Sequence, residues 1–285
     1  MATTVVPLPA ILCLHGAGTN SSIFQLQARR IVATLQSSFR FIFIDAPFGS
    51  PPGPGVHPAF TDLGPFYRWH CDSNVIDEFD ITLEDVERER WQVRDLIASH
   101  IKSERATGGP GIVGVMAFSQ GTRVATGLCL DKELSRGIEF AILIGGTFPS
   151  LELTASTPSH DDGYESGGMI WFEYDAYDKG LESLYRSPSS SSSSLTGSSS
   201  SPTPSTAPSS ADGNEWNIYP VNIPSIHVQG TADPWRSEGD RLRETYYNPD
   251  LTTVLKFRGR HQVPTGTPEA NIIAESVIST YEASM

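Results

Sequence analysis

Residues 112–121 read IVGVMAFSQG, an apolar run that ends abruptly at Ser119. A short apolar run of this kind predicts a buried strand, and the small polar residues after it favour a sharp turn into a helix. Residues 117–121 (AFSQG) match the nucleophile elbow G-x-S-x-G, with Ala117 in place of the first glycine. Ser119 is therefore the candidate nucleophile. The alternative interpretation is that Ser119 is an ordinary N-cap of the following helix.

Similar apolar runs alternate with helical patterns along the rest of the chain. This alternation, together with the elbow, predicts an α/β-hydrolase fold: a mostly parallel central sheet with helices on both faces and a cap or loop insertion. The other predicted strands are residues 10–14, 39–44, 139–145, 225–229 and 252–257. The first predicted helix has Asn20 or Ser21 as its N-cap and an apolar stripe from Phe24 to Leu35. The other predicted helices are residues 82–101, a segment starting at 120 or 121, and 268–281. Residues 48–70 are rich in Pro, Gly and aromatic residues and predict a long loop.

Two residues that could complete a catalytic triad follow the last two predicted strands. Of the 7 histidines, His261 alone comes after the last predicted strand, and Asp233 follows the strand before it. The order Ser, Asp, His is that of α/β-hydrolases, so we predict Ser119 as nucleophile, His261 as general base and Asp233 as the residue that orients His261. Asp240 and Asp45 are the alternative acids, and a surface position for His261 stays open.

A hydrolase of this kind also needs two backbone N–H groups that stabilise the oxyanion. Gln120, directly after the nucleophile, is the first predicted donor. The loop after the first predicted strand, residues 14–18 (LHGAG), supplies the second, and we choose Ala17 over Gly18. His15 in this loop is interpreted as a structural histidine.

Composition limits the classes of partner and compartment. The chain has 285 residues and a formal net charge of -13, which disfavours nucleic acid and anionic membranes as partners. No P-loop, dinucleotide fingerprint or metal-ligand spacing is present, so we expect neither cofactor nor metal. Its 3 cysteines are too few and too scattered for a disulfide framework. Without an apparent signal peptide or membrane span, we expect a cytoplasmic protein.

A serine-rich stretch interrupts the rhythm of strands and helices late in the chain. Residues 187–213 are dominated by Ser, Thr and Pro and bury too little apolar surface to offset the entropy lost on ordering. Because predicted strands on both sides are needed for one sheet, we predict a single α/β-hydrolase domain over residues 1–285 with a disordered insertion at 187–213.

Several motifs together resemble the fungal serine hydrolase (FSH1) family. They are LHGAGTN at 14–20, IDAPFGSPPGPGV at 44–56, GPFYRWH at 64–70, AFSQG at 117–121, GTADP at 230–234 and GRHQVP at 259–264. The resemblance covers the chain except for the serine-rich stretch, and it implies that the triad falls on Ser119, Asp233 and His261. The family elbow usually begins with glycine, where this chain has Ala117.

The resemblance also implies an activity. Many fungal members are thioesterases or esterases of polyketide gene clusters, including the lovastatin and citrinin pathways. We therefore expect a serine hydrolase that cleaves an ester or thioester bond and so releases or trims a polyketide. The expected substrate is a small-molecule acyl ester or acyl thioester, or an acyl chain carried by the acyl carrier domain of a polyketide synthase. The alternatives are a general small-molecule carboxylesterase and a non-catalytic receptor or scaffold with a hydrolase fold.

Overall fold

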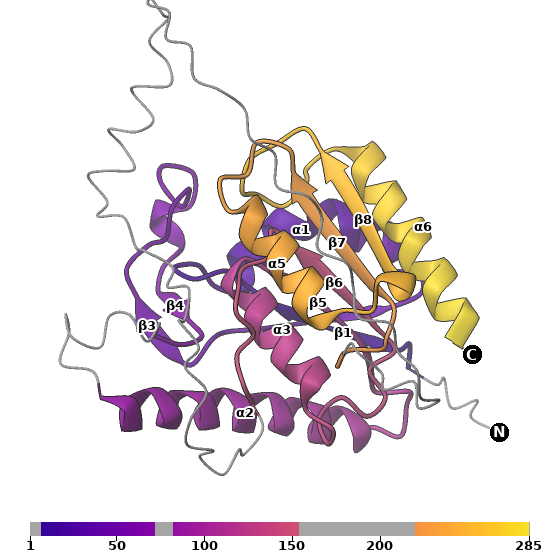
Figure 1. The fold of residues 1–285 in the computed structure, drawn as a ribbon, viewed down its shortest axis with the longest axis horizontal. Helices are drawn as coiled ribbons and strands as arrows, with labels where there is room; N and C mark the ends of the chain where they lie inside the picture. The colour runs from indigo at the N-terminus through magenta and orange to yellow at the C-terminus, as the bar shows by residue number, and fades with distance from the viewer. Residues whose placement is uncertain (1–6, 72–81, 154–219, 285) are drawn as a thin grey trace, which may run out of the picture. The chain divides into compact units, whose positions relative to one another are not determined.

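The computed structural model describes residues 7–71, 82–153 and 220–284. Within these ranges a six-stranded sheet runs in the order β2-β1-β5-β6-β7-β8 (Figure 1). All five strand pairs are parallel. The strands are β1 (Ala10–Leu14), β2 (Arg40–Ile44), β5 (Ile112–Phe118), β6 (Phe140–Ile144), β7 (Ser225–Gly230) and β8 (Thr252–Phe257). The predicted α/β-hydrolase architecture is confirmed.

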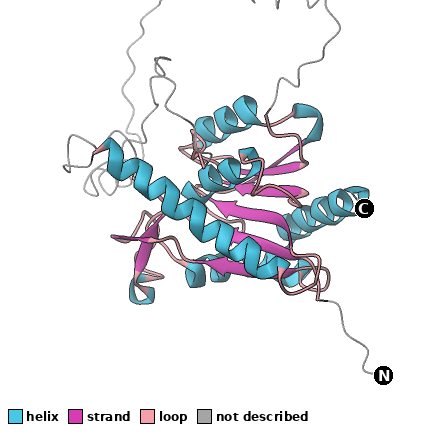
Figure 2. Cartoon of the chain, turned by 90° about the horizontal axis from the view of Figure 1, so that it is seen from below, coloured by secondary structure: helices cyan, strands magenta, loops and turns pink. Residues whose placement is uncertain are grey.

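Two hydrophobic cores lie on opposite faces of this sheet because side chains alternate along each strand. On β1, Leu12 and Leu14 join one core, whereas Ile11 and Cys13 join the other. The first core packs against α2 (Leu83–Arg105), α3 (Gln120–Leu130) and α5 (Arg236–Tyr246), and the second against α1 (Ser21–Leu35) and α6 (Thr267–Ser284). Figure 2 shows the strands running side by side with helices beside them.

The helix boundaries follow local signals that are readable in the sequence. Asn20 caps α1 by accepting the N–H of Ile23. Thr82 and Asp85 form a reciprocal capping box at the start of α2, which continues to Arg105, four residues past the predicted end. Its apolar stripe, Val86, Val93, Ile97 and Ile101, is buried as the helical spacing requires.

The predicted loop at 48–70 contains regular structure, so that prediction was wrong in part. β3 (Phe48–Ser50) and β4 (Phe66–Arg68) form a two-stranded antiparallel ribbon, with a 3-10 turn, η1 (Thr61–Leu63), between them. Three-residue strands are too short to show the alternation of apolar and polar residues that predicts a strand. The Pro and Gly residues between them are typical of a loop, so the sequence does not indicate that the two strands pair. A second 3-10 turn, η3 (Pro249–Leu251), precedes β8.

The serine-rich insertion expected at 187–213 lies outside the described residues, and the single domain over 1–285 stays a prediction. Among the helices within the described ranges, none combines the length and apolar character needed to cross a bilayer.

Candidate active site

Ser119 occupies a strained turn between β5 and α3. Its φ of 52° and ψ of -124° make it the one non-glycine residue with positive φ in the part of the chain that the structure describes. Such a conformation costs on the order of 1–3 kcal/mol and persists only where surrounding contacts enforce it. The Ser119 N–H donates to the carbonyl of Ile144 (3.0 Å), and the Thr122 hydroxyl donates to the Ser119 carbonyl (2.6 Å). Its hydroxyl makes no capping hydrogen bond, so Ser119 is not an ordinary N-cap.

Close approaches of glycine backbones place the turn at Ser119, here called the nucleophile turn, beside the loop after β1. A Cβ at Gly121 would lie 2.4 Å from the carbonyl oxygen of Leu14, a distance that no side chain tolerates. A Cβ at Gly16 would lie 3.1 Å from the Cβ of Ser119. The start of α3 therefore packs directly on the end of β1, and Gly16 lies against Ser119.

The three residues predicted as a triad lie in one hydrogen-bonded line. His261 Nδ1 is 2.9 Å from Asp233 Oδ2, and His261 Nε2 is 2.9 Å from Ser119 Oγ. Because the carboxylate accepts, Nδ1 carries the proton of the neutral imidazole, and the serine hydroxyl donates to Nε2. The second oxygen of Asp233 accepts the N–H of Trp235 (2.8 Å). The Asp233 side chain is 3% exposed and that of His261 13%, so the line runs from the interior toward solvent.

Three residues that sequence reasoning missed surround the imidazole of His261. The Trp235 ring lies edge-on at 4.5 Å between centroids, and the Phe118 ring lies at 5.1 Å. The backbone of Gly145, with φ of +55°, lies against the ring as well, since a Cβ there would be 3.0 Å from His261 Cε1. Gly145 was placed by the sequence as the last residue of the predicted strand 139–145, and a glycine at the end of a strand was the available signal for this position.

The loop after β1 has one N–H that is already engaged. The Gly18 N–H donates to the carbonyl of Tyr67 (2.8 Å), which removes it as an oxyanion donor. This observation favours Ala17, our choice from the sequence. Gln120 is the first residue of α3, where backbone N–H groups have no partner within the helix.

His15 is a structural histidine, in agreement with its interpretation from the sequence. Its Nδ1 donates to the carbonyl of Gly16 (2.7 Å), and its Nε2 accepts the N–H of Ala46 (3.0 Å). Both bonds fit only the neutral ring, and burial lowers its pKa from 6.5 to about 4. His15 therefore joins the loop after β1 to the segment after β2.

The alternative acids lie in other contacts. Asp240 accepts from the Gln229 amide (3.0 Å) and pairs with Arg243, and Asp45 accepts the N–H of Ser21 (2.7 Å) at the start of α1. Within the described ranges, no group of three or more His, Cys, Asp or Glu could hold a metal ion.

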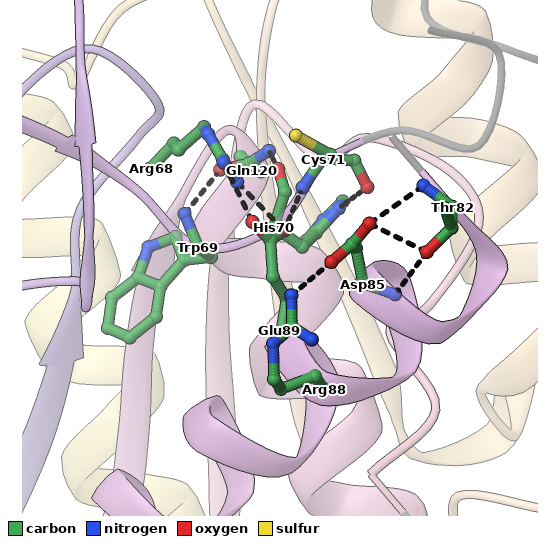
Figure 3. Close-up of polar contacts among 9 residues, drawn as sticks. All are labelled: Arg68, Trp69, His70, Cys71, Thr82, Asp85, Arg88, Glu89 and Gln120. Atoms are coloured by element: carbon green, nitrogen blue, oxygen red, sulfur yellow. Dashed lines mark hydrogen bonds and ion pairs between the residues drawn. The ribbon is translucent and has the colours of Figure 1, made fainter. Parts of the chain in front are cut away.

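Gln120 has a second set of contacts that the sequence did not indicate. Its side chain is buried, and its Oε1 accepts the backbone N–H of Trp69 (2.9 Å) while its Nε2 donates to the carbonyl of His70 (3.0 Å) (Figure 3). Glu89 of α2 holds the same segment through two bonds to Arg68 and one to the N–H of Cys71. Residues 68–71 are thus clamped between α2 and α3.

The parallel sheet, the strained serine turn and the line Ser119–His261–Asp233 define the class of α/β-hydrolases. The family model described as "Serine hydrolase (FSH1)" matches residues 5–273, and the chain belongs to this family of serine hydrolases.

Known relatives carry the names of ester-cleaving enzymes. The chain is 46% identical over 276 residues to thioesterase FSL2 of Gibberella zeae, covering 97% of this chain and 94% of that protein. It is 30% identical over 285 residues to a protein named esterase from Didymella fabae, covering 95% of this chain and 89% of that protein. The solved structure of YahD with malic acid is similar in fold, with a TM-score of 0.50 and 11% sequence identity. The match covers 96% of this chain and 94% of the YahD chain.

Proposed function

We propose that this serine hydrolase cleaves a thioester or ester through an acyl-enzyme on Ser119, and that it releases or trims a polyketide chain. The observation that carries the proposal is the pair of 2.9 Å contacts joining Ser119, His261 and Asp233 at a strained elbow. A serine hydroxyl is a weak nucleophile unless an adjacent base takes its proton. His261 is in place to do so.

The proposed reaction has two steps that share one base. Ser119 Oγ bonds to the carbonyl carbon while its proton moves to His261 Nε2, and Asp233 stabilises the imidazolium. The C–S or C–O bond then breaks, and His261 returns the proton to the leaving thiol or alcohol. Water, deprotonated by His261, then attacks the acyl-enzyme carbonyl carbon. The bond from this carbon to Ser119 Oγ breaks, and His261 returns the proton to Oγ, which frees a carboxylic acid and regenerates the serine.

The backbone N–H groups of Ala17 and Gln120 stabilise the oxyanion of both tetrahedral intermediates in this proposal. Both belong to segments that the packing of Gly16 and Gly121 brings against the nucleophile turn. Losing one such donor typically costs about 2.7–4 kcal/mol of barrier.

The substrate class rests on the relatives. A relative named thioesterase and one named esterase support both bond types. The sequence resemblance to polyketide-cluster enzymes supports a polyketide acyl group. An acyl carrier domain as donor, and the cytoplasm as compartment, belong to the same proposal. The second candidate is a general carboxylesterase, which the same triad would serve.

A paired set of substrates tests the proposal. One acyl chain is offered as an oxygen ester, as its N-acetylcysteamine thioester and on a carrier domain, and each is given to wild type, Ser119→Ala and Ser276→Ala. We expect Ser119→Ala to lose about 10³-fold or more of kcat and all fluorophosphonate labelling. Ser276, on α6, is the matched control and should retain both.

The results separate the candidates. Faster turnover of the thioesters supports thioester cleavage, and a preference for the oxygen ester supports the general carboxylesterase. No labelling and no turnover by folded wild type would contradict the hydrolase mechanism itself.

A further inference from the structure

Trp69 makes two hydrogen bonds to two separate parts of the active site. Its side chain is fully buried, and its indole Nε1 donates to the carbonyl of His15 (2.7 Å). Its backbone N–H donates to Oε1 of the Gln120 side chain (2.9 Å), as Figure 3 shows. His15 lies in the loop after β1, and Gln120 is the first residue of α3. Trp69 therefore bridges the two segments from opposite ends of its own residue.

These two segments carry the two proposed oxyanion donors, Ala17 and Gln120. We propose that Trp69 is a positioning residue that fixes the separation between the Ala17 and Gln120 N–H groups. The inference rests on the proposed acyl-enzyme mechanism. Because Trp69 is 0% exposed, it acts through its neighbours and does not contact substrate.

Trp69 can serve as a rigid bridge because its own chain segment is held on both sides. On one side, β4 pairs with the loop after β1: the Gly18 N–H donates to the Tyr67 carbonyl, and the Tyr67 N–H donates to the Thr19 carbonyl, both at 2.8 Å. On the other side, Gln120 Nε2 donates to the carbonyl of His70 (3.0 Å). The residues before and after Trp69 are thus tied to the same two segments.

Glu89 of α2 adds a third anchor. Its carboxylate makes a two-bond ion pair with Arg68 (2.7 and 2.9 Å) and accepts the N–H of Cys71 (2.7 Å). Two-bond arginine–carboxylate pairs fix orientation as well as distance. The bridge is therefore attached to the long helix α2, outside the nucleophile turn.

The consequence for catalysis is a differential one. Oxyanion donors act on negative charge that develops on the way to the tetrahedral intermediate and is absent from the bound substrate, and their effect depends on sub-ångström placement. Removing the indole N–H leaves the buried His15 carbonyl without this donor and removes one of the attachments that position the loop carrying Ala17. Ground-state binding of the acyl chain does not use these donors, so KM should change much less than kcat.

Two substitutions remove the indole donor. Trp69→Phe keeps an aromatic ring but is smaller. Replacement of Trp69 by 3-benzothienylalanine keeps the size of the ring and exchanges only the N–H for sulfur, so it tests the hydrogen bond even where the phenylalanine variant fails to fold. Trp91, 45% exposed on α2, receives the same two replacements as the matched control.

The readouts are kcat and KM for a p-nitrophenyl ester, and the inhibition constant of a trifluoromethyl ketone, whose hemiketal places an oxyanion in the hole. We expect both Trp69 variants to lose about 10- to 100-fold in kcat with KM within about 3-fold, somewhat less than the loss of a whole donor. The ketone should weaken by a similar factor. The Trp91 variants should match wild type.

A folded benzothienylalanine variant with kcat and ketone affinity within 2-fold of wild type would overturn the inference. A rise in KM as large as the fall in kcat would overturn it as well, since it indicates a general distortion of the active site. Failure of the proposed mechanism is a separate result: there, wild-type turnover is absent or survives Ser119→Ala.

Discussion

The imidazole of His261 lies directly against the backbone of Gly145, where a Cβ would stand 3.0 Å from Cε1 and 3.1 Å from Nδ1. Gly145 follows β6 with a φ of +55°, and its N–H donates to the carbonyl of Val228 (2.9 Å). The ring of the proposed general base therefore has its position set in part by the absence of a side chain.

Gly145→Ala should lower kcat more than Gly137→Ala does. The left-handed backbone costs an alanine about 1–2 kcal/mol, and the added methyl displaces His261 by a few tenths of an ångström. A misplacement of 1 Å can cost about 100-fold in rate, so we expect a loss of about 10-fold or more in kcat. Gly137→Ala is the control, because Gly137 also has positive φ (+86°) but open space around its Cβ position. Equal activity of the two variants would contradict the steric argument.

Much of the fold was predictable because its signals are local. A buried parallel strand is a continuous apolar run, and β1, β5 and β8 have the predicted bounds. The ribbon of β3 and β4 was not predictable in this way. Tyr67 is held by bonds to Gly18 and Thr19, about fifty residues earlier, and nothing in residues 66–68 alone indicates that pairing.

The candidate site divides along the same line. Ser119, Asp233 and His261 were found by their positions after parallel strands, whose carboxyl ends meet at one edge of the sheet. The contacts that hold them were not found. Trp69 appeared only as one aromatic among several, and the side chain of Gln120 had no assigned contact, because both depend on how α2, α3 and the ribbon pack.

Asp233→Asn and Asp240→Asn should behave differently, although both acids follow β7. Asp233 Oδ2 accepts the Nδ1 proton of His261, and an amide in its place favours the wrong tautomer of the imidazole. We expect kcat to fall about 10³- to 10⁴-fold. Asp240 contacts Gln229 and Arg243, so Asp240→Asn should keep kcat within about 3-fold. Steady-state kinetics of the two variants measures both values. A larger loss of kcat in Asp240→Asn than in Asp233→Asn would show that Asp240, not Asp233, is the acid that orients His261.

Ala117→Gly should restore the usual glycine of the elbow without a gain in activity. Ala117 is fully buried in the core below α3 and pairs with Leu14 and Leu143 across the sheet. Its methyl is accommodated, so removing it gives up packing and increases the entropy of the unfolded chain, at a cost of about 0.5–1 kcal/mol. Urea unfolding should show this loss while kcat stays within about 2-fold. A marked rise in kcat would mean that the methyl strains the turn.

His227 should make the protein less stable as the pH falls below neutrality. It lies on β7, 2% exposed, with Nε2 3.2 Å from Ser225 Oγ and its ring edge-on to Tyr247. Burial, and then the positive charge of Arg243, lower its pKa from 6.5 to about 3, whereas nearby Asp240 acts in the opposite direction.

Between pH 6.5 and about 3 the unfolded chain therefore binds a proton at this position that the folded chain does not, so the free energy of unfolding falls with falling pH. The slope approaches about 1.4 kcal/mol per pH unit for one histidine. Urea unfolding of wild type and His227→Asn at pH 7.5, 6 and 5 measures how the free energy of unfolding of each protein depends on pH. The variant should lose less stability than wild type between pH 6 and 5, while His15, whose pKa is lowered to about 4, sustains part of the dependence in both. Parallel curves for the two proteins would show that His227 is protonated in the folded state as readily as in the unfolded chain.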